Sequence, residues 1–119
     1  MVQITISEIA EMSKTALIKH GASDWIGSHV ADAVAKAESV GNRICGLYYL
    51  ESYCRQLRSG RVNGTVEPVV SNMKPGCVHV DAGMGFAQPA FARGLPSAVE
   101  LAQELGVATL AIGHAHTCT

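Results

Sequence analysis

Hydrophobic residues recur at helical spacing through the first half of the chain. A capping-box pattern at Thr5 and Glu8 predicts the start of a first helix. Its predicted apolar face comprises Ile9, Met12, Ala16 and Leu17. Ser23 predicts the start of a second helix, because a serine hydroxyl can cap a first turn. A third helix is predicted from about 45 to 59, so residues 1–62 form an expected helical N-terminal region.

The second half has a different pattern. Residues 63–76 are rich in Gly and Pro, which predicts a turn-rich connector. Alternation over 77–81 predicts a strand, and a helix is expected from about 88 to 105. The residues predicted to face inward on that helix are Val99, Leu101, Ala102 and Leu105. The apolar run 107–112 predicts a fully buried strand. The sequence therefore predicts that residues 77–119 begin a second, strand-containing domain.

Composition and charge narrow the function classes. The chain has 119 residues, 48% of them apolar, and a net charge of −1, which suits one globular domain with no broad attraction to nucleic acid or anionic membrane. No stretch approaches the roughly 20 apolar residues of a membrane span. The N-terminus has no basic leader with an apolar block, and the four cysteines match no disulfide framework. We therefore expect reduced thiols in a cytoplasmic protein.

The densest polar chemistry lies at the end of the chain. Alternation would put His114, His116 and Cys118 on one side of an extended segment, but no fourth ligand follows at a recognisable spacing, so no metal site is expected. His116 suits proton transfer, because imidazole titrates near neutral pH, although polar residues leaving a core would give the same pattern. The segment 83–85, Gly-Met-Gly, fits a tight turn rather than a phosphate loop.

Two further groups lie on the third predicted helix. Arg55, Arg58 and Arg61 are spaced by three, which fits a solvated face or an anion site. Tyr49 and Tyr53 share a face, which fits either packing or the lining of a pocket.

Taken in order along the chain, these motifs resemble a known family. The strings are Ala16-Leu17, Gly21-Ala22-Ser23, Val30-Ala31-Asp32-Ala33, Leu57-Arg58-Ser59-Gly60, Val80-Asp81-Ala82-Gly83-Met84-Gly85 and Gly113-His114-Ala115-His116. They resemble the type-2 malate/L-lactate dehydrogenases, which include ureidoglycolate dehydrogenase, sulfolactate dehydrogenases and Δ1-piperideine-2-carboxylate/Δ1-pyrroline-2-carboxylate reductases. The resemblance implies an α/β fold in which an N-terminal helical region precedes an unusual non-Rossmann, mostly antiparallel NAD(P)H-binding sheet.

The resemblance also implies site residues. The family pattern Gly-x-x-Ser-His-Gly-x-x-Arg falls here on a segment where Ile44 replaces the Ser, Cys45 the His and Tyr49 the Arg. Cys45 and Tyr49 are therefore expected to line the substrate pocket, although a tyrosine cannot grip a carboxylate with two charge-assisted hydrogen bonds as a guanidinium does. The later Ser-x-His pattern falls on His114 and His116.

That second match carries the expected chemistry. It implies that His116 is the catalytic residue at the reacting carbon and that His114 contacts substrate. Thr117 and Cys118, which follow at once, are the expected cofactor contacts. The cofactor implied is NADPH or NADH, and the substrate is a small 2-keto acid or a cyclic imino acid.

The length of the chain departs from the family, because members are much longer. The resemblance therefore predicts that a missing segment or a second polypeptide completes the sheet, within an oligomer. It implies one component of an NAD(P)H-dependent dehydrogenase or reductase. Because the Ser-His and Arg positions are replaced, a non-catalytic structural or regulatory subunit is the alternative.

Overall fold

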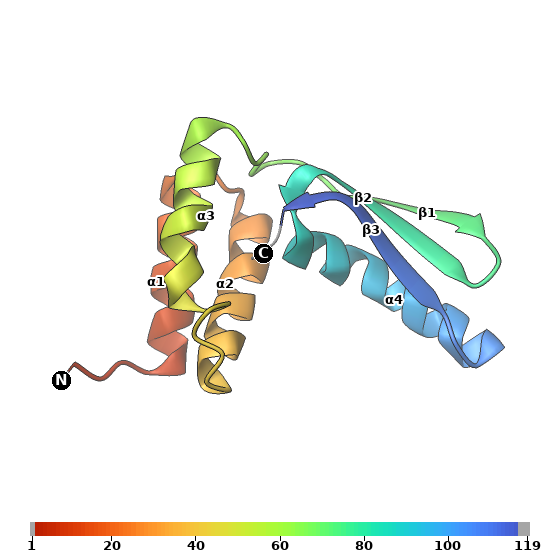
Figure 1. Cartoon of the computed structure of the whole chain (residues 1–119), viewed down its shortest axis with the longest axis horizontal. Coiled ribbons are helices and arrows are strands. Elements are labelled where there is room, and N and C mark those ends of the chain that lie inside the picture. The colour runs from red at the N-terminus through yellow and green to blue at the C-terminus, as the bar shows by residue number, and fades with distance from the viewer. Residues whose placement is uncertain (1, 117–119) are drawn as a thin grey trace. The chain divides into compact units, whose positions relative to one another are not determined.

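A computed structural model describes residues 2–116, with only the backbone of Met73 (Figure 1). The chain divides into two compact units, the first extending to Thr65 and the second beginning at Val66. The first unit consists of helices and the second combines three strands with one long helix. The coarse prediction of an α/β chain with a helical N-terminal part is confirmed.

Helix α1 (Ile6–Lys19) begins with the predicted capping box. The Thr5 hydroxyl accepts a hydrogen bond from the Glu8 N–H at 3.1 Å, and the Glu8 carboxylate accepts one from the Thr5 N–H at 2.6 Å. The bond from the Thr5 N–H, and then one from the Thr5 hydroxyl to the Glu8 carboxylate, hold the pKa of Glu8 below its usual range. Two donors of the first turn are thereby satisfied without tertiary contacts.

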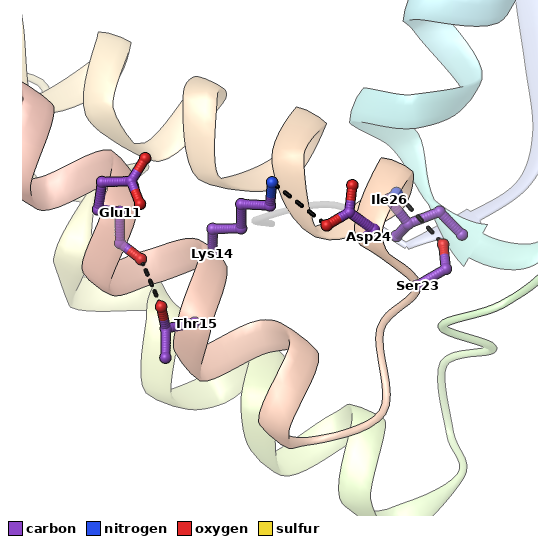
Figure 2. A network of polar contacts seen from close by, with 6 residues as sticks. All are labelled: Glu11, Lys14, Thr15, Ser23, Asp24 and Ile26. Atoms are coloured by element: carbon purple, nitrogen blue, oxygen red, sulfur yellow. Dashed lines mark hydrogen bonds and ion pairs between the residues drawn. The ribbon is translucent and has the colours of Figure 1, made fainter.

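Helix α2 (Asp24–Ser39) starts at the predicted Ser23 cap, whose hydroxyl accepts from the Ile26 N–H at 3.3 Å (Figure 2). An ion pair of 3.3 Å joins Lys14 Nζ on α1 to Asp24 on α2. The core between the helices is built from Ile9, Leu17, Ile26, Val30 and Val34. Met12 was predicted to face this core and instead is 58% exposed, while Ser13 occupies the buried position beside it.

Helix α3 (Leu47–Ser59) has a cap that comes from another helix. Gly46 has no side chain to cap the first turn, and the Glu38 carboxylate of α2 accepts the Leu47 N–H at 2.8 Å. A Cβ on Gly46 would collide with that carboxylate, so a larger residue there would displace the cap. The helix ends at Gly60 in the left-handed conformation, as the sequence predicts.

The second unit contains a three-stranded sheet of β1 (Val69–Lys74), β2 (Cys77–Phe86) and β3 (Thr109–His116), in that order. The pair β1–β2 is antiparallel and the pair β2–β3 is parallel. The sheet is therefore mixed over the described residues, rather than mostly antiparallel. Strand β1 lies inside the segment 63–76, for which the sequence predicted a turn-rich connector.

Helix α4 (Ala87–Leu105) covers one face of the sheet. Its buried positions are Pro89, Ala90, Gly94 and Ala98, and they lie close to the strands. A Cβ added at Gly94 would fall 2.7 Å from Leu110 Cδ1 and would also meet Val80. The predicted inward face was wrong at Val99 and Leu105, which are about half exposed, while Leu101 and Ala102 are half-buried.

Strand β3 was predicted to be fully buried. Its residues are exposed or half-buried, and among the described residues it pairs only with β2. Leu110 and Ile112 do pack towards α4, with Val80 and Ala82 of β2. The other face of the sheet carries the alternate residues of β2 and is not covered by α4.

Over residues 2–116, no helix combines the length and the apolar character that crossing a lipid bilayer requires.

Candidate functional site

A bulge between β2 and β3 organises the polar residues of the second unit. The register runs from Asp81 opposite Gly113 to Gly85 opposite Ala115, so four steps on β2 match two on β3. The segment 83–85 is therefore part of strand β2, and the predicted loop is wrong. Such bulges re-aim side chains and occur often beside active sites.

Two residues that are not glycine have positive φ in this bulge. Met84 has a φ of 66° and His114 a φ of 50°. A non-glycine residue in the left-handed region costs roughly 1–2 kcal/mol, so the surrounding structure must hold it there. The alternation expected through His114 is broken at this residue, and its imidazole lies where it can contact β2.

The contact is with Asp81. His114 Nδ1 lies 3.2 Å from Asp81 Oδ1, and the same oxygen accepts the Gly83 N–H at 2.8 Å. The Gly83 hydrogen bond, and then the one from His114, hold the pKa of the Asp81 carboxyl below its usual range. An ionised carboxylate only accepts, so Nδ1 of His114 donates and Nε2 remains for another partner. The His114 side chain is 70% exposed, which leaves this ring accessible within the unit.

His79 belongs to the same face of the sheet. It precedes Asp81 by two residues on β2, and its positive form also favours the ionised Asp81 carboxyl. Its Nε2 would lie 3.2 Å from a Cβ at position 113, so Gly113 allows the ring to lie over β3. The face opposite α4 thus gathers two imidazoles around one carboxylate, an arrangement suited to proton transfer.

His116, the predicted catalytic residue, closes β3. It is half-buried, lies opposite Phe86 in the register, and the two rings meet with centroids 6.2 Å apart. The two predicted cofactor contacts, Thr117 and Cys118, lie outside the described residues.

Cys45 and Tyr49, predicted to line the substrate pocket, belong to the first unit. Cys45 is half-buried just before α3, where its N–H donates to Asn42 Oδ1 at 3.4 Å. Tyr49 lies in the first turn of α3, with its ring 6.0 Å from that of the buried Tyr53. A shallow cavity of about 340 Å³ is lined by Tyr48, Tyr49, Glu51, Ser52 and Arg55.

Sequence reasoning missed three residues of importance. His79 and Asp81 were recognised only as members of an alternating strand, although that alternation places both on one face. Glu38 gave no local signal, because its role depends on a helix that begins nine residues later. Among the described residues, no group of three His, Cys, Asp or Glu side chains could hold a metal ion, and Cys118 lies beyond them.

Comparisons with known proteins match almost the whole chain. It is 34% identical over 116 residues to a Δ1-pyrroline-2-carboxylate/Δ1-piperideine-2-carboxylate reductase of Pseudomonas putida, covering 98% of this chain and 34% of that protein. It is 36% identical over 113 residues to a (2R)-3-sulfolactate dehydrogenase (NADP⁺) of Chromohalobacter salexigens, covering 95% of this chain and 34% of that protein.

Solved structures of similar proteins share the fold of this chain. The Δ1-piperideine-2-carboxylate reductase of Pseudomonas syringae superposes with a TM-score of 0.92 at 31% identity, over 98% of this chain and 35% of that one. A malate dehydrogenase of Pyrococcus horikoshii, at 21% identity, shares the fold with a TM-score of 0.85, over 97% of this chain and 33% of that one. The chain spans about a third of the length of the curated relatives it matches. A family model described as malate/L-lactate dehydrogenase matches residues 4–119, and the chain belongs to this family.

Proposed function

We propose that the chain is a component of an NAD(P)H-dependent oxidoreductase that reduces a small 2-keto acid or cyclic imino acid. The observation that carries the proposal is the bulge at the end of β3, which brings Asp81 to His114 two residues before His116. The names of the relatives support the substrate class, since they include both imino acid reductases and a hydroxy acid dehydrogenase.

His116 acts as the proton donor or substrate polariser in this proposal. It ends a strand that is held by β2 and by packing against α4, so its backbone is fixed, and its ring contacts that of Phe86. A neutral-pH acid–base group at a rigid position suits reduction of a C=O or C=N bond, because the product needs one proton. His114 contacts substrate through the Nε2 that the Asp81 bond leaves available.

Cys45 and Tyr49 line the substrate pocket in the proposal. Both are less polar than the His and Arg of the family pattern, which favours a pyrroline or piperideine ring over a hydroxy diacid. Arg55 shares the shallow cavity of Tyr49 and carries a guanidinium, although it is paired with Glu51 at 2.7 Å.

In this proposal the described residues supply only part of the dinucleotide site. The Gly-Met-Gly segment is part of a paired strand, and the Gly83 N–H already donates to Asp81, so it cannot cradle a phosphate. Thr117 and Cys118 are the proposed contacts to NADPH or NADH within this chain. When bound, the cofactor would supply the hydride, and a further segment or a second polypeptide would supply most of its binding residues.

The test uses the chain with whatever polypeptide co-purifies with it. NADPH or NADH oxidation is followed at 340 nm with Δ1-pyrroline-2-carboxylate, Δ1-piperideine-2-carboxylate and pyruvate. We expect turnover with a cyclic imine, a loss of about 100-fold or more in kcat for His116→Ala, and wild-type rates for His29→Ala on α2. No consumption of either cofactor across this panel, in a folded assembly, would refute the proposal.

The alternative is a non-catalytic subunit of such an enzyme. The observation that favours it is the replacement of the Ser-His and Arg positions by Ile44, Cys45 and Tyr49. The same His116→Ala variant distinguishes the two functions. Full activity of this variant in the assembly would assign this chain a structural or regulatory role.

A further inference from the structure

A groove in the helical unit shares Glu51 and Arg55 with the shallow cavity of Tyr49, and its other residues have no part in the proposed reaction. It occupies about 460 Å³ between α1 and α3, within the range of small-molecule sites. Its lining comprises Ala16, His20, Leu47, Leu50, Glu51, Cys54, Arg55 and Arg58. All of these residues belong to the first compact unit, so the groove depends on no placement of one unit against the other.

The floor of the groove is apolar. Leu47 and Leu50 are half-buried and Cys54 is 8% exposed, so hydrocarbon and sulfur line the part of α3 that faces α1. Burial raises the pKa of the Cys54 thiol, which keeps this wall uncharged at neutral pH. Such a floor favours a ligand with a hydrocarbon body, since burying apolar surface is the main gain available.

The rim carries one positive charge, that of Arg58 in the last turn of α3, with no carboxylate ion-paired to it among the described residues. Arg55 Nη2 is paired with the Glu51 carboxylate at 2.7 Å, so these two charges cancel. Over the described part of the chain, no carboxylate forms an ion pair with Arg58, although Arg58 lines the same groove. One guanidinium offers two parallel donors to a carboxylate.

His20 completes the rim with a defined donor pattern. Its Nδ1 lies 2.7 Å from the Ala16 carbonyl oxygen, which can only accept, so Nδ1 donates inward to the helix. Nε2 is then the ring atom left for a ligand. The charged groups around the groove are thus Glu51, Arg55 and Arg58, with His20 as the titratable neighbour.

We propose that this groove binds a small monocarboxylate with an aliphatic body, the carboxylate on Arg58 and the hydrocarbon over Leu47 and Leu50. The net charge of +1 at the rim suits a monoanion better than a phosphate dianion. A ligand without a hydrocarbon body would leave the apolar floor uncovered. The proposed contacts, Arg58, Leu47 and Leu50, have no part in the reduction proposed above.

The test measures octanoate binding to the purified protein by ligand-observed NMR. Acetate supplies the charge without the body, and octan-1-ol supplies the body without the charge. We expect octanoate to bind more tightly than either. Arg58→Gln should weaken octanoate binding at least about tenfold, because the charged guanidinium and its hydrogen bonds to the carboxylate are lost.

Arg61→Gln is the matched control. Arg61 belongs to the same arginine series but does not line the groove, so its loss should leave octanoate affinity unchanged. Leu50→Gln tests the floor independently and should also weaken binding, with helical circular dichroism confirming that each variant is folded. Equal effects of Arg58→Gln and Arg61→Gln, acetate binding as tight as octanoate, or no octanoate binding would overturn the proposal. So would a dimer that dissociates in Arg58→Gln, because a second copy would then occupy the groove.

Discussion

Gly94→Ala tests how closely α4 approaches the sheet. Alanine is the better helix former by about 1 kcal/mol, so on propensity alone the variant should be more stable. The new Cβ, however, would lie 2.7 Å from Leu110 Cδ1 and would also meet Val80, which is fully buried. Overpacking of this kind costs about 1–3 kcal/mol, and a fully buried partner has little room to move. Subtracting the gain of about 1 from a cost of about 3 gives a net loss of roughly 2 kcal/mol.

The assay is urea unfolding followed by far-ultraviolet circular dichroism. Gly27→Ala on α2 is the matched control, because its Cβ would meet Ile18 Cγ1 at 3.1 Å on a side chain that is 40% exposed and can turn away. We expect Gly27→Ala to be neutral or slightly stabilising. The relief variant is Val80→Ala, which removes one of the two obstructing side chains.

A double-mutant cycle of Gly94→Ala with Val80→Ala isolates the steric contribution to the free energy of unfolding. In the Val80→Ala background the cost of Gly94→Ala should fall by about 1 kcal/mol, a coupling that independent sites do not show. A stabilised Gly94→Ala protein, or a cost that Val80→Ala leaves unchanged, would refute the close approach of α4 to the sheet.

Three further predictions concern single hydrogen bonds. Glu38→Ala removes the carboxylate that caps α3 and should lower the free energy of unfolding by about 1 kcal/mol in urea, whereas an unchanged midpoint would contradict the cap. Thr5→Ala removes the cap and should cost a similar amount. It should also raise the pKa of Glu8, measured by carboxyl ¹³C NMR, because the hydrogen bond from the Thr5 hydroxyl to the carboxylate is lost. His114→Gln should raise the pKa of Asp81 in the same measurement. The lowered pKa of Asp81 contributes stability at pH values above the pKa of the unfolded chain, and this stability is lost as the pH falls through the pKa of the folded protein. The wild-type protein should therefore stay folded to lower pH than this variant.

Local signals made parts of the fold predictable. The Thr5 and Ser23 caps and the Gly60 stop were found because each is satisfied within a few residues of itself. The sequence did not predict the Glu38 cap on Leu47 or the hydrogen bond from His114 to Asp81. The two residues of these pairs lie 9 and 33 positions apart. Pairing across such separations is decided by tertiary structure, which spacing in one segment does not encode.

The errors in the second half have a common physical origin. Large apolar residues were taken to mark the inner face of α4, but the sheet comes so close that only small residues fit there. Ala90, Gly94 and Ala98 face the strands, and Val99 is left half exposed. Likewise the segment 83–85 resembles a loop in isolation and becomes a strand bulge only when β3 lies beside it.

The order in which the strands pair has a consequence for how the second unit folds. The β1–β2 pair closes through the tight turn at Pro75 and Gly76, so its contacts are local and form early. The β2–β3 pair is parallel, and its connection contains the whole of α4, so a longer segment must be closed before these strands pair. Refolding should therefore complete the hairpin first, and the left-handed His114, held by Asp81, is among the last residues to reach its native conformation.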